Sequence, residues 1–95
     1  MSGWEVYAEI AVDRSLVDDS VAREAAEEIN RGLMDRQRGT ARFDAGALLI
    51  TIRMDEGSSE KGVHGEAVGI IDRTLDELGV HDYARRYRRL DVLPT

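Results

Sequence analysis

Arginines alternate with tyrosines near the C-terminus, and this is the sharpest local pattern in the sequence. The segment reads Tyr83-Ala84-Arg85-Arg86-Tyr87-Arg88-Arg89. Guanidinium groups pair with phosphates or carboxylates, and aromatic rings stack on nucleic-acid bases. The segment therefore predicts a contact surface, for a protein partner or for nucleic acid.

Charge decides between these two partners. Residues 79–95 carry four arginines against two aspartates, a local charge of +2, whereas the whole chain has a formal net charge of −6. Phosphate contacts need a positive surface, so nucleic-acid binding is possible but is not the favoured expectation. An internal role is open as well: the arginines neutralise acidic helices, or they line an edge strand and discourage edge-to-edge aggregation.

A second candidate surface lies around Tyr7, in a segment where apolar and polar residues alternate. RNA-recognition modules stack bases on aromatic residues of two central strands. Tyr7 is flanked by Glu5 and Glu9, which repel phosphate, and the apolar segment at 47–54 contains no aromatic residue. We therefore expect this surface to be a solvated face or a subunit contact.

Two more residues complete that surface in the predicted sheet. Leu49 adds to an apolar centre, and Arg53 belongs to a charged edge. Interfaces between proteins often combine an apolar centre with aromatic and arginine residues. We expect a protein partner or a second copy to dock here; the alternative is a solvated face with cross-strand pairs between Glu5 or Glu9 and Arg53 or Arg42.

Catalytic and metal-binding patterns are missing from the sequence. The chain has no cysteine, so thiolate chemistry and disulfides are excluded. His64 and His81 lack ligand spacing, and the acidic loop around Asp55 lacks the alternating acids of a calcium-binding loop. We expect no cofactor, no metal site and no catalytic residue, and we favour a function other than catalysis.

Hydropathy patterns predict six regular elements. A period of two indicates a strand at 4–12, and a period near 3.6 indicates a helix from Asp18–Ser20 to about Asp35. The remaining elements are a strand at 40–44, a hairpin at 44–46, a strand at 47–54, a polar loop at 55–61 with a flexible Gly57-Ser58-Ser59, a helix at 63–78 capped by Gly79, a turn at 81–85 and an edge strand at 86–92.

Two details of these elements stay open. The C-terminal tail also fits a helical face; as a strand, it places Tyr87, Arg89 and Asp91 on one side. Gly65 and Gly69 lower the helix propensity of their segment, and a close approach of this helix to the sheet would explain them.

The order strand, helix, strand, strand, helix, strand predicts an α+β fold. The economical arrangement is a ferredoxin-like βαββαβ sandwich, a four-stranded antiparallel sheet with two helices on one face. Its first and third strands are central. The other face then remains open, with Tyr7, Leu49 and Arg53 exposed on it.

The length of 95 residues fits one domain spanning 1–95. There is no signal-peptide pattern and no apolar run near the about 20 residues that span a bilayer, so we expect a cytoplasmic protein and no membrane partner. The favoured function is a non-enzymatic interaction module that self-associates or docks a partner on the open face. The alternatives are nucleic-acid contact through the Arg/Tyr segment, and a small-molecule regulator or enzyme of dimeric ferredoxin-like type, with a pocket bordered by Trp4, Phe43 or Met54.

Overall fold

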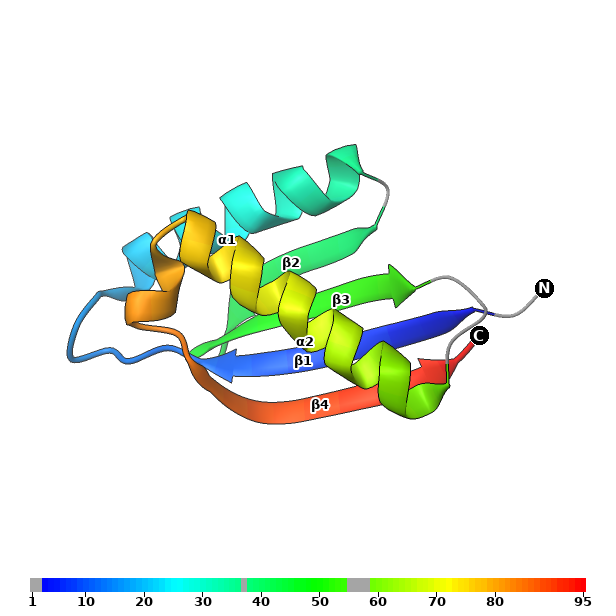
Figure 1. Ribbon diagram of the computed structural model, residues 1–95. Coiled ribbons are helices and arrows are strands. Elements are labelled where there is room, and N and C mark those ends of the chain that lie inside the picture. Colours follow the sequence, from blue (N-terminus) through cyan, green and yellow to red (C-terminus); the bar gives the residue numbers. More distant parts are fainter. Residues whose placement is uncertain (1–2, 37, 55–58) are drawn as a thin grey trace.

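The computed structural model describes residues 3–36, 38–54 and 59–95 of the chain. They form an α+β fold with one four-stranded antiparallel sheet and two long helices (Figure 1). The elements in chain order are β1 (Trp4–Ala11), α1 (Asp19–Asp35), β2 (Gly39–Asp44), β3 (Ala47–Met54), α2 (Glu60–Glu77), the 3₁₀ turn η1 (Val80–Asp82) and β4 (Arg86–Pro94). The six predicted elements are thus confirmed, with shifted boundaries.

The strands lie in the order β2-β3-β1-β4. The most apolar strands, β1 and β3, are therefore central, as predicted, and β2 and β4 form the two edges. Tyr7 lies opposite Thr51 on β3 and opposite Asp91 on β4. This register fixes which side chains share a face.

Both helices cover the same face of the sheet (Figure 1). The alternating apolar residues of the central strands point toward them, and Val6, Ala8 and Ile10 are all fully buried. From β3, Leu48, Ile50, Ile52 and Met54 add to the strand side of the core. Alternation with a period of two is what gives the sheet one apolar face and one polar face.

Side-chain oxygens cap both helices. The Asp18 carboxylate accepts a hydrogen bond from the Val21 amide at 3.1 Å, and Ser59 accepts one from the Gly62 amide at 3.2 Å. These oxygens satisfy amides that have no partner inside the helix. The predicted polar loop at 55–61 is too long, because Ser59 starts α2 there; Gly57 and Ser58 lie outside the described residues.

The β2–β3 hairpin turns through Ala45 and Gly46. Their φ angles are +51° and +77°, and Asp44 pairs directly with Ala47. A two-residue hairpin loop needs this left-handed backbone, which glycine adopts without strain. The hairpin prediction is confirmed.

A close approach to the sheet, which was left open as an explanation for two glycines of α2, does not occur at either of them. A β-carbon added at Gly65 or Gly69 would meet no atom within 4 Å. These glycines lie on the exposed side of α2, so nothing in the packing requires them. The tight position is Gly39 on β2, where a β-carbon would overlap the carbonyl oxygen of Thr51.

The tail forms an edge strand, and its helical alternative is wrong. A β-bulge between Glu9 and Ile10 places Arg89 opposite Glu9 but Tyr87 opposite Ile10, which leaves Arg88 as the extra residue of β4. A bulge inserts one residue into a strand, so the residues before it and after it no longer follow one alternation. Tyr87 therefore does not share a side with Arg89 and Asp91, contrary to the strict alternation expected from sequence.

No helix within these described ranges is both long and apolar enough to cross a membrane.

Candidate interaction surfaces

The sheet face opposite the helices is called the open face below. Its outward positions come from all four strands. They are Glu5, Tyr7, Glu9 and Ala11 of β1, Thr40, Arg42 and Asp44 of β2, Ala47, Leu49, Thr51 and Arg53 of β3, and Arg86, Arg89, Asp91 and Leu93 of β4. The sequence-predicted residues Tyr7, Leu49, Arg53, Arg86 and Arg89 thus lie on one surface.

Four side chains form a connected cluster on β1 and β4. The Tyr7 hydroxyl donates to Glu9 Oε1 at 2.8 Å, and Arg89 Nε lies 2.6 Å from Asp91 Oδ2. The Arg89 guanidinium carbon lies 5.9 Å from the centre of the Tyr7 ring. The pKa of Tyr7 is raised because its hydroxyl bonds to the Glu9 carboxylate and is partly desolvated. Arg89 lies over the ring that a base would stack on.

The expected cross-strand pairs of Glu5 or Glu9 with Arg53 or Arg42 do not form. Within the described ranges, the salt bridges are Arg89–Asp91 and Arg14–Asp19. Glu9 bonds to a phenol instead, because Tyr7 is its neighbour two residues away on the same side of β1. Arg42 therefore lies without an ion-pair partner among the described residues.

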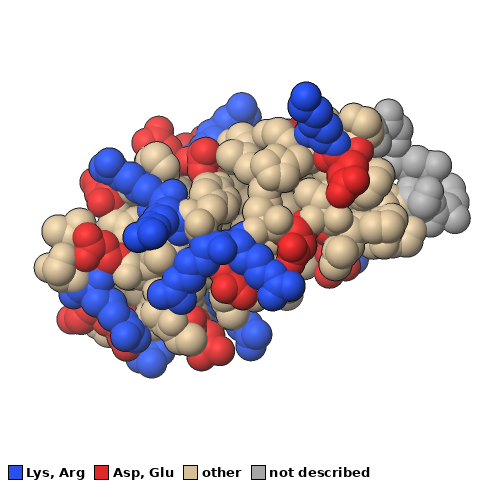
Figure 2. Space-filling model, turned by 90° about the horizontal axis from the view of Figure 1, so that it is seen from below, with Lys and Arg blue, Asp and Glu red and all other residues tan. Residues whose placement is uncertain are grey.

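Arg88 extends this surface toward the hairpin. Its Nη1 donates to the carbonyl oxygen of Ala45 at 3.3 Å. Since β1 and β3 lie between β4 and β2, this side chain reaches over the end of the sheet. Figure 2 shows basic side chains gathered over the half of the open face at this end, with acidic side chains among them.

Charge differs between the two sides of the molecule. Helices α1 and α2 each contain five acidic and two basic side chains. The open-face positions, with Arg88, contain five arginines and four acidic residues. The sequence left open that the arginines of the tail neutralise the acidic helices. The β4 arginines lie on the sheet side and do not have this role.

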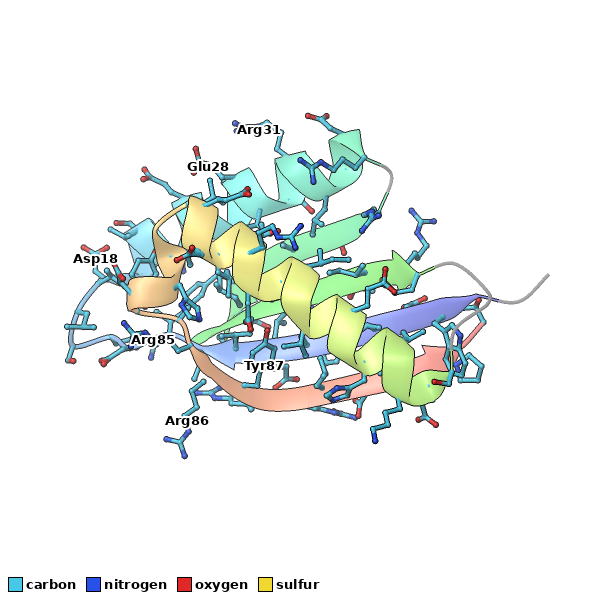
Figure 3. All side chains as sticks on the ribbon, viewed as in Figure 1. Asp18, Glu28, Arg31, Arg85, Arg86 and Tyr87 are labelled. Atoms are coloured by element: carbon cyan, nitrogen blue, oxygen red, sulfur yellow. The ribbon has the colours of Figure 1, made fainter. Side chains whose placement is uncertain are left out.

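Tyr87 and Tyr83 lie away from the open face. The Tyr87 hydroxyl donates to Asp72 Oδ1 of α2 at 2.8 Å, and burial together with this bond raises the pKa of Tyr87 well above its usual range. Figure 3 shows Tyr87 pointing from β4 toward α2, while Arg86 projects from the opposite side of the strand. Tyr83 packs against the core, where burial and the Glu28 carboxylate raise its pKa. The interleaved tyrosines and arginines therefore do not form one stacking platform.

Arg85 belongs to a groove at the end of the sheet. Its Nε donates to the His81 carbonyl oxygen at 2.8 Å. The groove has a volume of about 590 Å³ and is lined by Leu16, Tyr83, Arg85 and Arg86 among others. Leu16 is 63% exposed, so the groove combines an apolar wall with two guanidinium groups and with the carboxylates of Asp13 and Asp82.

A second groove follows the outer strand β4, and no pattern in the sequence indicated it. It has a volume of about 450 Å³ and runs between Leu90–Leu93 and the first turn of α2, which contributes Lys61 and His64. Leu93 is 54% exposed. The sequence analysis also did not identify Asp91 as a surface residue. Its position two residues after Arg89 is the signal that could have revealed the pairing of the two side chains.

The residues expected to border a pocket pack inward instead. Met54 is buried, and Trp4 and Phe43 lie against the core. In the part of the chain that the structure describes, no three histidine or acidic side chains gather closely enough to hold a metal ion.

Comparison of this chain with protein-family models, with curated proteins and with solved structures gives no match.

Proposed function

We propose that the chain is a non-enzymatic interaction module of the ferredoxin-like βαββαβ type, and that its open face docks a protein partner rich in acidic side chains. The strand order β2-β3-β1-β4, with helices after β1 and β3, supports the proposed chain path. Fold alone does not select a function, so the functional part rests on the surface.

One observation carries the functional proposal. The hairpin end of the open face presents Arg42, Arg86 and Arg88 without a carboxylate at salt-bridge distance within the described residues. The rest of the chain is acidic, since each helix has five acidic side chains against two basic ones. Complementary charge steers partners and fixes their orientation, so an acidic partner is attracted to this end and repelled by the helices.

The centre of the face supports a protein partner rather than a base. Leu49, Thr51 and Tyr7 are half-buried. Arg89 occupies the space over the Tyr7 ring, and β3 provides no second aromatic residue. Nucleic-acid contact through residues 83–89 remains the alternative, disfavoured by the inward positions of Tyr83 and Tyr87.

A small-molecule function is the third possibility. The groove of about 590 Å³ beside Leu16 is lined by two guanidinium groups and two carboxylates, so it suits a small molecule that carries charges of both signs and an apolar group. Thermal-shift screening separates this possibility from protein docking.

The experiment measures fluorescence anisotropy of a labelled glutamate-rich peptide titrated with the protein at low salt. We expect binding that weakens as salt is added, because the contact is between exposed charges. The variant Arg42→Glu/Arg86→Glu/Arg88→Glu should lower the affinity by about tenfold or more.

The matched control reverses three helix arginines in Arg23→Glu/Arg31→Glu/Arg73→Glu. It changes the net charge by the same amount and should lower the affinity far less. A single-stranded oligonucleotide of equal charge forms the second arm. Tighter binding of the oligonucleotide would favour the nucleic-acid alternative, and equal losses in both triple variants would overturn the proposed site.

A further inference from the structure

The two edges of the sheet differ in how their backbone groups are satisfied. On β2, the amide of Ala41 donates to Asn30 Oδ1 of α1 at 2.9 Å, so a helix side chain occupies this edge. Among the described residues, no side chain bonds to the outer backbone of β4 between Leu90 and Val92, and the groove of about 450 Å³ runs beside it. An uncovered edge strand is a template for pairing with another strand.

Hydrogen bonding to β1 shows which amides of β4 point outward. The Thr95 amide donates to the Gly3 carbonyl oxygen at 3.0 Å, so the pair of residues 3 and 95 is hydrogen-bonded. Such pairs alternate in an antiparallel ladder, which turns the amides of Leu93, Asp91 and Arg89 toward β1. The backbone groups of Leu90 and Val92 then point away from the sheet. Pro94, which has no amide hydrogen, falls on an outward position too.

We infer that a second copy of this chain pairs with β4, antiparallel and centred on Leu90. A two-fold axis there places Leu90 opposite its own counterpart and Arg89 opposite Asp91 of the other copy. Both Arg89–Asp91 pairs are then on the open face, at positions without backbone hydrogen bonds, where side chains approach most closely. Opposite charges at directly facing positions stabilise a strand pair.

Charge complementarity selects this register over its neighbours. Moving the two-fold axis by one residue, to Arg89 or to Asp91, still lets outward backbone groups face each other. It places Arg89 opposite Arg89 of the other copy, or Asp91 opposite Asp91. Like charges at facing positions destabilise a strand pair. The Arg89 side chain is 62% exposed and has further guanidinium donors beyond the Nε that contacts its own Asp91, so it can serve both aspartates.

The ends of β4 limit the pairing to a short central segment. The bulge at Arg88 interrupts one end, and Pro94 removes a donor at the other. Bulges and prolines are ordinary means of blocking strand edges. The pairing is two-fold and uses the same strand of both copies, so the association closes at two copies instead of extending into a filament. At the other edge of the sheet, the Ala41 amide already donates to Asn30. The association leaves both open faces exposed side by side, and it does not depend on what docks there.

The test exchanges the two charges and measures mass by sedimentation equilibrium over a range of concentrations. The unmodified chain should approach twice its chain mass. Arg89→Asp alone and Asp91→Arg alone should each weaken self-association by about tenfold or more, since each sets like charges opposite each other twice. An equal mixture of the two single variants should recover the doubled mass. In a mixed pair, one copy has two acidic side chains at these positions and the other has two basic ones, so both facing positions again join opposite charges.

The mixture distinguishes pairing between copies from the contact within one copy, since the internal Arg89–Asp91 contact is broken in both variants. Arg73→Asp on α2 is the matched control and should associate like the unmodified chain. A second measurement needs no substitution: exchange of the Leu90 amide with deuterium should slow as concentration rises, while exchange of the Arg89 and Asp91 amides should not. A monomer at all concentrations, a mixture that stays monomeric, or exchange at Leu90 that ignores concentration would overturn the inference. The peptide assay on Arg42, Arg86 and Arg88 would be unaffected by such a result.

Discussion

The phenol of Tyr7 is held between an acid and a guanidinium group on the open face. It donates to Glu9, which favours the neutral phenol, and Arg89 lies over its ring, which opposes this effect. The hydrogen bond is the largest cause and the pKa is raised. A raised pKa means that the stabilising contribution is present below the ordinary value of about 10 and is lost as the pH rises through the folded value.

Replacing Glu9 should therefore lower the pKa of Tyr7. In Glu9→Gln the phenol loses its charged acceptor, and ultraviolet absorbance during an alkaline titration should show one tyrosine ionising closer to pH about 10. The variant Tyr7→Phe shows which part of the absorbance change belongs to Tyr7, because it removes that tyrosine from the titration. Superimposable curves for Glu9→Gln and the unmodified chain would show that Glu9 does not hold the phenol.

Single residues also mark where prediction from sequence stopped. Alternation correctly placed Tyr7, Leu49 and Arg53 on one face, because β1 and β3 pair in regular register over their whole length. Alternation failed for Tyr87, because a one-residue bulge follows it and reverses the side of the sheet to which it points. Hydropathy does not reveal such a bulge.

At the scale of elements, helix-capping residues and hydropathy periodicity were sufficient to predict the helices and strands whose structure depends on nearby residues. Asp18 starts α1 and the Ala45-Gly46 turn closes the hairpin through contacts a few residues apart. The bond between Asn30 and the Ala41 amide could not be foreseen, since it depends on how α1 lies against β2. The empty space beside Gly65 could not be foreseen either, because a glycine in a helix is compatible both with close packing and with full exposure.

The helix glycines give a prediction at this scale. Gly65→Ala and Gly69→Ala should each stabilise the fold by about 1 kcal/mol, because the added methyl group meets open space and alanine favours a helix. Gly39→Ala should destabilise it by roughly 1–3 kcal/mol, because its methyl group overlaps the Thr51 backbone. Urea unfolding measures all three free energies. Destabilisation by Gly65→Ala would mean that α2 packs against something at that position.

For the whole molecule, the separation of charge follows from its layers. The helices present their acidic residues to solvent on one side, and the strands present most of the arginines of β2, β3 and β4 on the other. Sequence composition alone shows only a net charge of −6. The fold converts this average into one repulsive and one attractive side, which is the basis of the proposed docking of an acidic partner.

The most direct measurement follows the arginine Nε–H signals by nuclear magnetic resonance while a glutamate-rich peptide is added. The signals of Arg42, Arg86 and Arg88 on the sheet side should shift and saturate together, and those of Arg23 and Arg31 on α1 and Arg73 on α2 should stay in place. Equal shifts on both sides, or shifts confined to the helices, would contradict the assignment of the open face as the docking surface.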